Sequence, residues 1–555
     1  MHRMNDRRTD RLALAALGAV ALAVSVYGSG GAHPAGMARA ALSALPESMA
    51  VTALRFVLAL GCGMILTTLL GIACVPLRRF GFLGLAGVRV MEIAPPIGVL
   101  ALLLTLVTTR TAHETVLLLA AAAPAIWGAG RAIGEAIATV PADLHAATLG
   151  MGMTGWQRLW RLEVPFSIPA GMRALRVALP VCWMTLLAGE MLGAEKLFAP
   201  GLGGMAIAAA QSGAVGLILL DALACAVLVT AFDRMMMAPA LAWAARFDGG
   251  GTAGMRLVWL LAIWRRWKIL NRLSTIGHAV VIQLGMIRFG RPPRGREADS
   301  DACPTAGRDA ELFWWVVLAA AVAMLAVFPP SGLRLLDLGL VIENALFTTL
   351  RVLLTCGLAG VTALLLASHI GARSRLEGPI RLLALYPPVL LYPLMAAFVL
   401  DWGLHPGVWL TALVFPGTFL LMLLALMGGM RAMPPDLMRA ARSLDLRGAL
   451  LWRRLLLPGL AVPLADGAFA AFMWCWNATL MADALSWKGI PVHTPGLGSL
   501  MNRALATDDA QHAALTLVAA TVVVLMLSQL AWSKLRAQLA LRFTLSPRVP
   551  SGRAY

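Results

Sequence analysis

The sequence predicts an all-α polytopic membrane protein with about 12 transmembrane helices, arranged as two homologous halves of six helices each. Three observations predict this fold. Of the 555 residues, 59% are hydrophobic and 13% are charged, whereas an average soluble domain carries roughly 25% charged residues. Apolar runs long enough to cross the hydrocarbon layer, which takes about 20 residues, recur along the whole chain. Finally, the second half repeats landmarks of the first half at a nearly constant spacing.

The expected spans form two sets of six. In the first half they lie near residues 11–28, 49–76, 86–108, 114–134, 172–192 and 214–240. In the second half they lie near residues 312–330, 345–369, 380–400, 407–429, 464–486 and 512–533. Arginines before the first span are also typical of a signal peptide. We favour an uncleaved helix, because the second half contains a counterpart of this span.

Four landmarks match between the halves at offsets of 296, 292, 293 and 295 residues. In order they are Thr52 to Arg55 with Thr348 to Arg351, Pro95-Pro96 with Pro387-Pro388, Pro165 with Pro458, and Gly201 to Gly203 with Gly496 to Gly498. Matches in the same order and at one spacing indicate an internal duplication. Because six spans is an even number, both halves enter the membrane in the same orientation. An axis along the membrane normal should relate them, with a transport path between them.

The distribution of basic residues predicts the orientation. The net charge is +18, and with the N-terminus in the cytoplasm only eight of the 46 basic residues fall at the outer side. These eight are Arg39, Arg55, Arg110, Lys196, Arg334, Arg351, Lys488 and Arg503. Cytoplasmic loops of membrane proteins carry such an excess of Lys and Arg. The basic charge therefore needs no nucleic-acid partner, and both termini are expected in the cytoplasm.

The spans and loops divide the chain into four parts. These are a first half at 1–240 with a loop near 143–171, a segment at 241–311, a second half at 312–540 with a loop near 436–464, and a cytoplasmic tail at 541–555. The segment at 241–311 mixes Trp with Arg and Lys before a polar stretch. That pattern predicts a basic helix in the inner membrane interface followed by a linker.

No enzyme chemistry is visible in the sequence. The seven cysteines and nine histidines are scattered without the spacing of a metal site, and no catalytic motif stands in its expected context. A phosphate-binding loop of the G-x-x-x-x-G-K-[ST] type is also absent, because none of the four lysines fits it. We therefore expect no catalytic residue, no metal and no cofactor in this chain.

Two loops carry a repeated motif. The second half contains Arg439-Ala440-Ala441, then Asp445, then a Leu-Leu-Leu segment that ends at Pro458. The first half contains Ala146-Ala147-Thr148, then Gly152, then a Leu-Glu-Val segment that ends at Pro165. Both resemble the EAA loop of ABC importer permeases, whose pattern is E-A-A, three residues, Gly, nine residues and I-x-L-P. The Glu of that pattern is replaced in both copies.

The resemblance implies the partners. In ABC importers this loop docks on a cytoplasmic ATPase subunit, so ATP and Mg are expected on two copies of a separate ATPase. A periplasmic solute-binding protein would deliver the substrate, and the membrane would be the bacterial inner membrane. Glu190 and the Gly-Leu-Gly block after it resemble nitrate, sulfonate and taurine permeases, which implies a small anion. Residues 150–154 resemble osmoprotectant permeases, so a quaternary amine stays open.

Several polar or helix-breaking residues are candidates for the path. Glu190 and Asp483 lie at the outer ends of equivalent spans, where they either face each other as a gate or cap local helices. The pairs Pro95-Pro96 and Pro387-Pro388 interrupt spans, which predicts either broken helices beside the path or simple kinks. Asn477 could meet a polar solute or pack internally.

Two other functions compete with the importer. An ion-gradient-driven secondary transporter would need buried ionisable relays and no ATPase. A non-transporting scaffold or sensor would need soluble domains. The two EAA-like loops favour the importer.

Overall fold

The computed structural model describes residues 35–73, 91–247, 283, 286–287, 335–370, 377–446, 448–492 and 494–543. Every structural statement below concerns these residues. The expected spans near 11–28 and 312–330, nearly all of the segment at 241–311 and the tail from 544 onward lie outside them.

The described part of the first half consists of helices. Its elements are α2 (Ala35–Ala73), α4 (Pro96–Leu106), α5 (Arg110–Ala138), α6 (Ala142–Gly150), α7 (Gly155–Arg158), the π-helix η2 (Leu159–Glu163), α8 (Val164–Leu192), α9 (Leu202–Ser212), α10 (Val215–Phe232), the π-helix η3 (Asp233–Met237), α11 (Ala238–Ala244) and the 3-10 helix η4 (Ala245–Phe247).

The second half repeats much of this order. Its elements are α15 (Leu335–Ile370), α16 (Glu377–Leu385), the 3-10 helix η6 (Pro388–Leu391), α17 (Tyr392–Asp401), α18 (Pro406–Ala432), α19 (Pro435–Ser443), α20 (Gly448–Leu451), the π-helix η7 (Trp452–Leu456), α21 (Leu457–Ala482), strands β1 (Ser486–Trp487) and β2 (Ile490–Pro491), α22 (Leu497–Ala506), α23 (Ala510–Met526), the π-helix η8 (Leu527–Trp532) and α24 (Ser533–Phe543).

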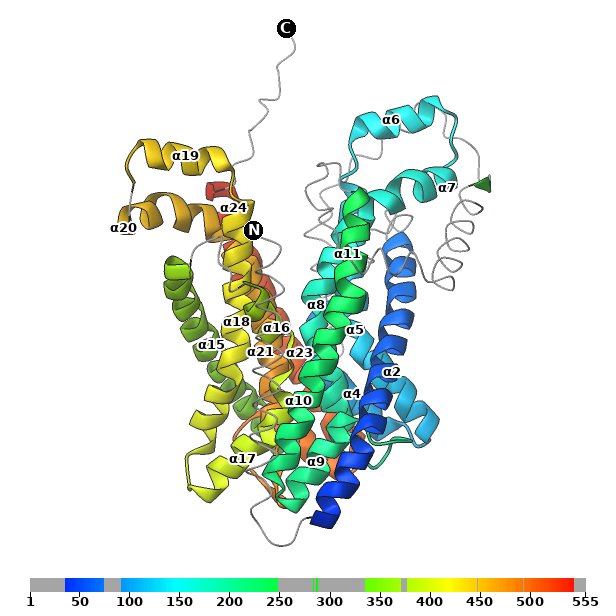
Figure 1. Ribbon diagram of the computed structural model, residues 1–555, viewed down its shortest axis with the longest axis vertical. Coiled ribbons are helices and arrows are strands. Elements are labelled where there is room, and N and C mark those ends of the chain that lie inside the picture. Colours follow the sequence, from blue (N-terminus) through cyan, green and yellow to red (C-terminus); the bar gives the residue numbers. More distant parts are fainter. Residues whose placement is uncertain are drawn as a thin grey trace.

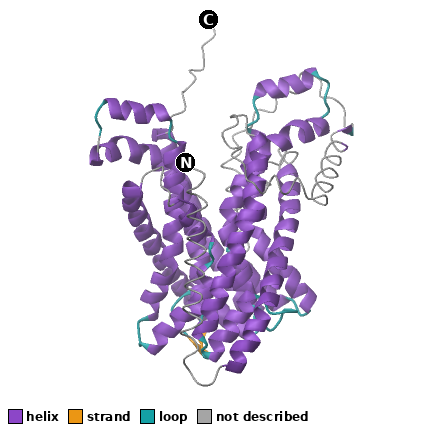
Figure 2. Cartoon of the chain, in the orientation of Figure 1, coloured by secondary structure: helices purple, strands orange, loops and turns teal. Residues whose placement is uncertain are grey.

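The helical membrane fold is confirmed. Seven described helices are long and apolar enough to cross a membrane, or eight if the bent pair formed by α16 and η6–α17 is one span, and α4 and α23 are shorter apolar helices. Each of the ten expected spans within the described ranges falls on helix. The small antiparallel hairpin of β1 and β2 was not predicted (Figure 2). Its turn residues Lys488 and Gly489 both have positive φ angles, which suits a two-residue hairpin turn.

Small residues let the helices of each half approach closely. A Cβ added to Gly71 of α2 would lie 2.5 Å from the Ile133 side chain of α5, and one added to Gly171 of α8 would lie 2.7 Å from the same side chain. In a membrane, where lipid is as apolar as the side chains, such close contacts supply much of the packing energy. Phe56 of α2 stacks on Trp183 of α8, with ring centroids 3.5 Å apart, so the second and fifth expected spans of this half are in contact.

The two halves converge at one end and diverge at the other (Figure 1). We call the end that carries α9 and α17 the closed end, and the end that carries α6 and α19 the loop end. Near the closed end, α4 packs against α21, α22 and α23 of the other half, while η6 packs against α8 and α10. At the loop end, α6 and α19 lie on separate arms of the molecule (Figure 1).

Candidate functional site

The loop end of each half carries the same unit. In the first half α6, α7, η2 and α8 begin at residues 142, 155, 159 and 164, and in the second half α19, α20, η7 and α21 begin at 435, 448, 452 and 457. All four offsets are 293 residues. Both units contain a short helix, a turn, a second short helix and a π-helix that leads into a long span. The two EAA-like segments therefore have the same local structure.

Specific residues mark where the helices of these two units end and begin. Gly152 and Asp445 follow α6 and α19 at equivalent positions, and their φ angles are +65° and +51°. The left-handed conformation ends each helix, as is common at helix C-termini. Pro165 and Pro458 lie in the first turns of α8 and α21, directly after the π-helices η2 and η7. Because proline has no backbone N–H to donate to the helix ladder, the change from π-helix to α-helix falls at these residues.

The alanines of the motif differ in exposure. Ala146, Ala147 and Ala440 are exposed, whereas Ala441 is 4% exposed and faces the interior of its own unit. In the second copy, the two alanines of the motif therefore do not share one exposed surface. At the offset of 293, Ala440 is the counterpart of Ala147. The replaced Glu position is occupied by Arg439, which pairs with Asp436 one turn earlier.

Near the closed end, the first half contains a buried charge cluster around Glu190. Thr52 donates to Glu190 at 3.1 and 3.0 Å, Arg55 donates to it at 2.9 Å, and the backbone N–H of Gly203 donates to it at 3.0 Å. Arg55 also binds Glu114 of α5 at 2.9 Å. Since Glu190 is fully buried, these bonds replace the water that an isolated charge would need.

The second half repeats the cluster around Asp483. Arg351 donates to both carboxylate oxygens at 2.6 and 2.7 Å, and Thr494 donates at 3.1 Å. The backbone N–H of Leu497 donates to Thr348 at 3.0 Å, as that of Leu202 donates to Thr52 at 2.9 Å. Each cluster therefore joins the first long helix of its half, the end of the α8 or α21 span, and the start of α9 or α22.

The Gly-Leu-Gly blocks are explained by this geometry. A Cβ added to Gly203 would lie 2.5 Å from the carbonyl oxygen of Leu187, and one added to Gly498 would overlap the carbonyl oxygen of Leu480. A Cβ on Gly201 or Gly496 would collide with the carboxylate of its own cluster. Only glycine allows the backbone to approach this closely.

The two carboxylates do not pair with each other. Their described hydrogen-bond partners all belong to their own half, which favours the alternative of local bonding over a direct contact across the axis. A gate role for them stays a prediction. Sequence reasoning used Thr52–Arg55 and Thr348–Arg351 only as repeat markers. The signal that marks them as partners is an arginine in an apolar helix of each half, repeated at an offset close to that of the two buried acids.

Both proline pairs interrupt helices. Pro95 is extended and α4 begins at Pro96, and the second half bends by 67° between residues 385 and 388. The break at Pro95 leaves the N–H of Ile97 without an intrahelical acceptor, and the side-chain oxygen of Asn477 from the other half accepts it at 3.5 Å. Asn477 is thus placed at the interface of the halves. Whether it or the prolines contact solute stays a prediction.

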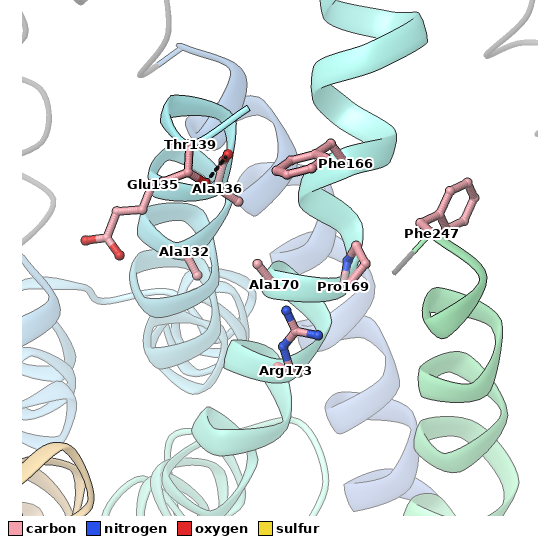
Figure 3. A pocket seen from close by; sticks show the side chains of 9 residues that line it. All are labelled: Ala132, Glu135, Ala136, Thr139, Phe166, Pro169, Ala170, Arg173 and Phe247. Atoms are coloured by element: carbon pink, nitrogen blue, oxygen red, sulfur yellow. Dashed lines mark hydrogen bonds between the residues drawn. The ribbon is translucent and has the colours of Figure 1, made fainter. Parts of the chain in front are cut away.

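A hollow of about 420 Å³ lies at the loop end of the first half. Figure 3 shows Ala132 and Ala136 of α5 opposite Phe166 and Ala170 of α8, with Phe247 of η4 on the far side of α8. Its lining residues belong to the first half, except Phe247, which lies just after it, and none comes from the second half. The hollow is therefore no part of the interface between the halves.

These features define a polytopic helical membrane protein with two pseudo-symmetric halves that meet at one end and carry matching short helices at the other. The chain belongs to the family described as the inner membrane component of binding-protein-dependent transport systems, which matches it twice, over residues 63–238 and 359–533. The duplicated, fused permease suggested by the internal repeat is therefore confirmed.

A further comparison gives a weaker likeness. The chain is 32% identical over 112 residues to the osmoprotectant import permease protein OsmY of Salmonella typhimurium. That match covers 20% of this chain and 46% of the relative, so the chain spans less than half the length of that protein. No solved structure matches the chain significantly.

The family sets the coarse function. By its family description, the chain is an inner membrane component of a binding-protein-dependent transport system. Permeases of this kind are typically not enzymes themselves.

Proposed function

We propose that this single chain forms the complete translocation unit of an ABC importer in a bacterial inner membrane. Two copies of a separate ATPase, which bind ATP and Mg, dock on α6 and α19. A periplasmic solute-binding protein delivers a small polar solute to the opposite side. The loop end then lies in the cytoplasm, together with both termini.

One observation carries this proposal. The unit formed by a short helix, a left-handed residue, a second short helix and a π-helix occurs twice at one offset. Two equivalent docking helices on one chain match two equivalent ATPase subunits, as expected for a symmetric motor. An ion-gradient-driven transporter would have no use for a duplicated exposed helix at this position.

The arrangement of the halves also supports alternating access. The halves pack together near the closed end and lie on separate arms at the loop end. Closure of two ATP-bound ATPases would draw α6 and α19 together. Because each short helix continues through a π-helix into a long span, that movement would be passed to the interface between the halves and would open the closed end.

The substrate class is the finer part of the proposal. We favour a small anion such as nitrate or a sulfonate, because the acid and Gly-Leu-Gly pattern resembles permeases of such solutes. A quaternary amine is the second candidate, since the OsmY protein is named for osmoprotectant import.

The docking proposal is tested with the double variant Ala147→Asp and Ala440→Asp. Both positions are exposed equivalents on α6 and α19, so the chain should still fold and insert. Each added carboxylate must be desolvated in a close helix interface. We expect the ATPase that co-purifies with the tagged wild-type chain to be lost, along with ATP-driven uptake.

Two controls define the outcome. Ala506→Asp places the same charge at an exposed position near the closed end and should leave ATPase co-purification unchanged. Ala147→Ser with Ala440→Ser keeps a small side chain and should retain it as well. If the double aspartate variant retains the ATPase at wild-type stoichiometry, α6 and α19 are not the docking helices.

A further inference from the structure

A buried carboxyl group of the first half, that of Asp221, lies on a helix that contacts the second half. Asp221 is on α10 and is 1% exposed. Neither of its carboxyl oxygens has a hydrogen-bond partner among the residues that the structure describes. Helix α10 packs against η6 and α17 of the second half. An unsatisfied acid is therefore buried beside the interface along which a solute would pass.

A second unsatisfied polar group lies close to Asp221 and comes from the other half. The hydroxyl group of Tyr386 is buried and has no hydrogen-bond partner among the described residues. Tyr386 lies between α16 and η6, at the 67° bend that separates them. It interacts electrostatically with Asp221 and with Cys225, which is one turn further along α10. The two halves thus bring an unsatisfied acceptor and an unsatisfied hydroxyl together at the proline break.

The other buried acids of the described chain have basic partners. Five acidic side chains are buried there, and four of them lie within 3.8 Å of an arginine: Glu163 with Arg158, Glu190 with Arg55, Asp233 with Arg176, and Asp483 with Arg351. Asp221 is the fifth, and its electrostatic neighbour Glu190 is another acid. Burial of a carboxylate without a cation is strongly unfavourable. The packing of the described residues does not explain why an acid occupies this position.

We propose that Asp221 binds the cationic nitrogen of a small solute as the solute passes between the halves. A carboxylate forms strong, charge-assisted hydrogen bonds with an ammonium group, and the ring of Tyr386 offers a desolvated cation a favourable aromatic face. The Tyr386 hydroxyl donates to an acidic group on the same solute. In the described conformation Asp221 is buried, so a solute reaches it only where the halves part.

This inference rests on the proposed permease function and narrows its substrate class. Among sulfonates it selects those that also carry an amine, and it is equally compatible with a quaternary amine. Nitrate and simple sulfonates have no group that a carboxylate would attract. A zwitterion, which carries both a cationic nitrogen and an acidic group, fits Asp221 and Tyr386 together.

The test measures binding without transport. The full chain in lipid nanodiscs is heated with choline, glycine betaine or taurine, and with methanesulfonate, nitrate or sodium chloride at matched ionic strength as references. A ligand that binds any folded conformation, and not the unfolded chain, raises Tm. We expect at least one of the three nitrogen cations to raise Tm in a saturable way, and we expect no saturable shift with the references.

Variants connect the shift to the site. Asp221→Asn should weaken the apparent affinity roughly tenfold or more, because it removes a charged hydrogen bond, and Tyr386→Phe should weaken it about two- to tenfold. Without ligand, Asp221→Asn should have a Tm no lower than that of the wild type, because a neutral amide is easier to bury than a carboxylate. Asp401→Asn makes the same change at an exposed position of α17 and should keep the wild-type affinity.

Three results would overturn the site. They are no saturable shift with choline, glycine betaine or taurine, the same shift with methanesulfonate or nitrate, and an unchanged affinity in Asp221→Asn. A raised Tm with unchanged affinity in that variant would mean that Asp221 is only a neutral buried acid. Because this readout needs no ATPase, its failure leaves the docking test on α6 and α19 unaffected.

Discussion

At the scale of single residues, the two buried carboxylates illustrate how charge is tolerated within an apolar helix bundle. Glu190 and Asp483 are inaccessible to solvent, and each has an arginine, a threonine and a backbone N–H from its own half as partners. An unpaired charge at such a position would cost several kcal/mol. Their local pairing favours a role in fixing α9 and α22 against the long helices, which positions the closed end.

Gly498→Ala should destabilise the second half. The new methyl group would overlap the carbonyl oxygen of Leu480, so α22 would shift and weaken the hydrogen bond from Leu497 to Thr348. Overpacking of this kind costs about 1–3 kcal/mol, measurable as a lower Tm in detergent. Gly428→Ala is the matched control, because nothing lies within 4 Å of its added Cβ. Equal Tm values for the two variants would contradict the close-approach explanation.

At the scale of helices and loops, the sequence predicts elements better than contacts. Hydropathy located ten spans that fall on described helices, because a run of about 20 apolar residues is the length that a helix needs to cross the hydrocarbon core. The β1–β2 hairpin escaped prediction because its strands are two residues each. The inward orientation of Ala441 and the bond from Ile97 to Asn477 depend on how distant elements pack, which periodicity in one segment does not encode.

Gly152→Ala tests the turn that ends α6. Its φ of +65° costs an L-residue roughly 1–2 kcal/mol, so the turn should open about five- to thirtyfold more often. Hydrogen exchange of the amides in α6 and α7 would report this opening. Gly150→Ala is the control, since that residue has open space around it and no positive φ. If hydrogen exchange is unchanged in Gly152→Ala, the left-handed turn at residue 152 does not control how often α6 opens.

At the scale of the whole molecule, the duplication is imperfect where the halves touch. Internal clusters repeat, but two contacts between the halves have no counterpart among the described residues: the N–H of Ile97 donates to the side-chain oxygen of Asn477, and the backbone N–H of Lys488 donates to the carbonyl oxygen of Ala210 at 3.1 Å. A fused chain can specialise each half separately, because the two halves are encoded by different residues of one sequence. Because of this asymmetry, the internal repeat predicts the fold of each half. It does not predict which residues form contacts between the halves.

The ion pair between Lys196 and Asp508 should help to hold the closed end together. It joins the segment after α8 to the one before α23 at 2.7 Å. The hydrogen bond and charge of Lys196 lower the pKa of Asp508 below its ordinary value. Because the pKa is lowered, the contribution is fully present above the ordinary Asp value of about 3.9 and is lost as the pH falls through the lowered pKa.

Lys196→Gln should therefore let the closed end separate more often at pH 7, with no further change between pH 6 and pH 8. Distances between spin labels at positions 110 and 506, with the exposed Cys62 replaced by serine, would measure this separation across the halves. As the pH falls through the lowered pKa of Asp508, the wild-type distribution should approach that of the variant, since protonated Asp508 no longer attracts Lys196. Lys534→Gln removes an equal charge at the loop end and should behave as wild type. A wild-type distribution that is already indistinguishable from Lys196→Gln at pH 7 would show that the closed end is held by helix packing around α4 alone.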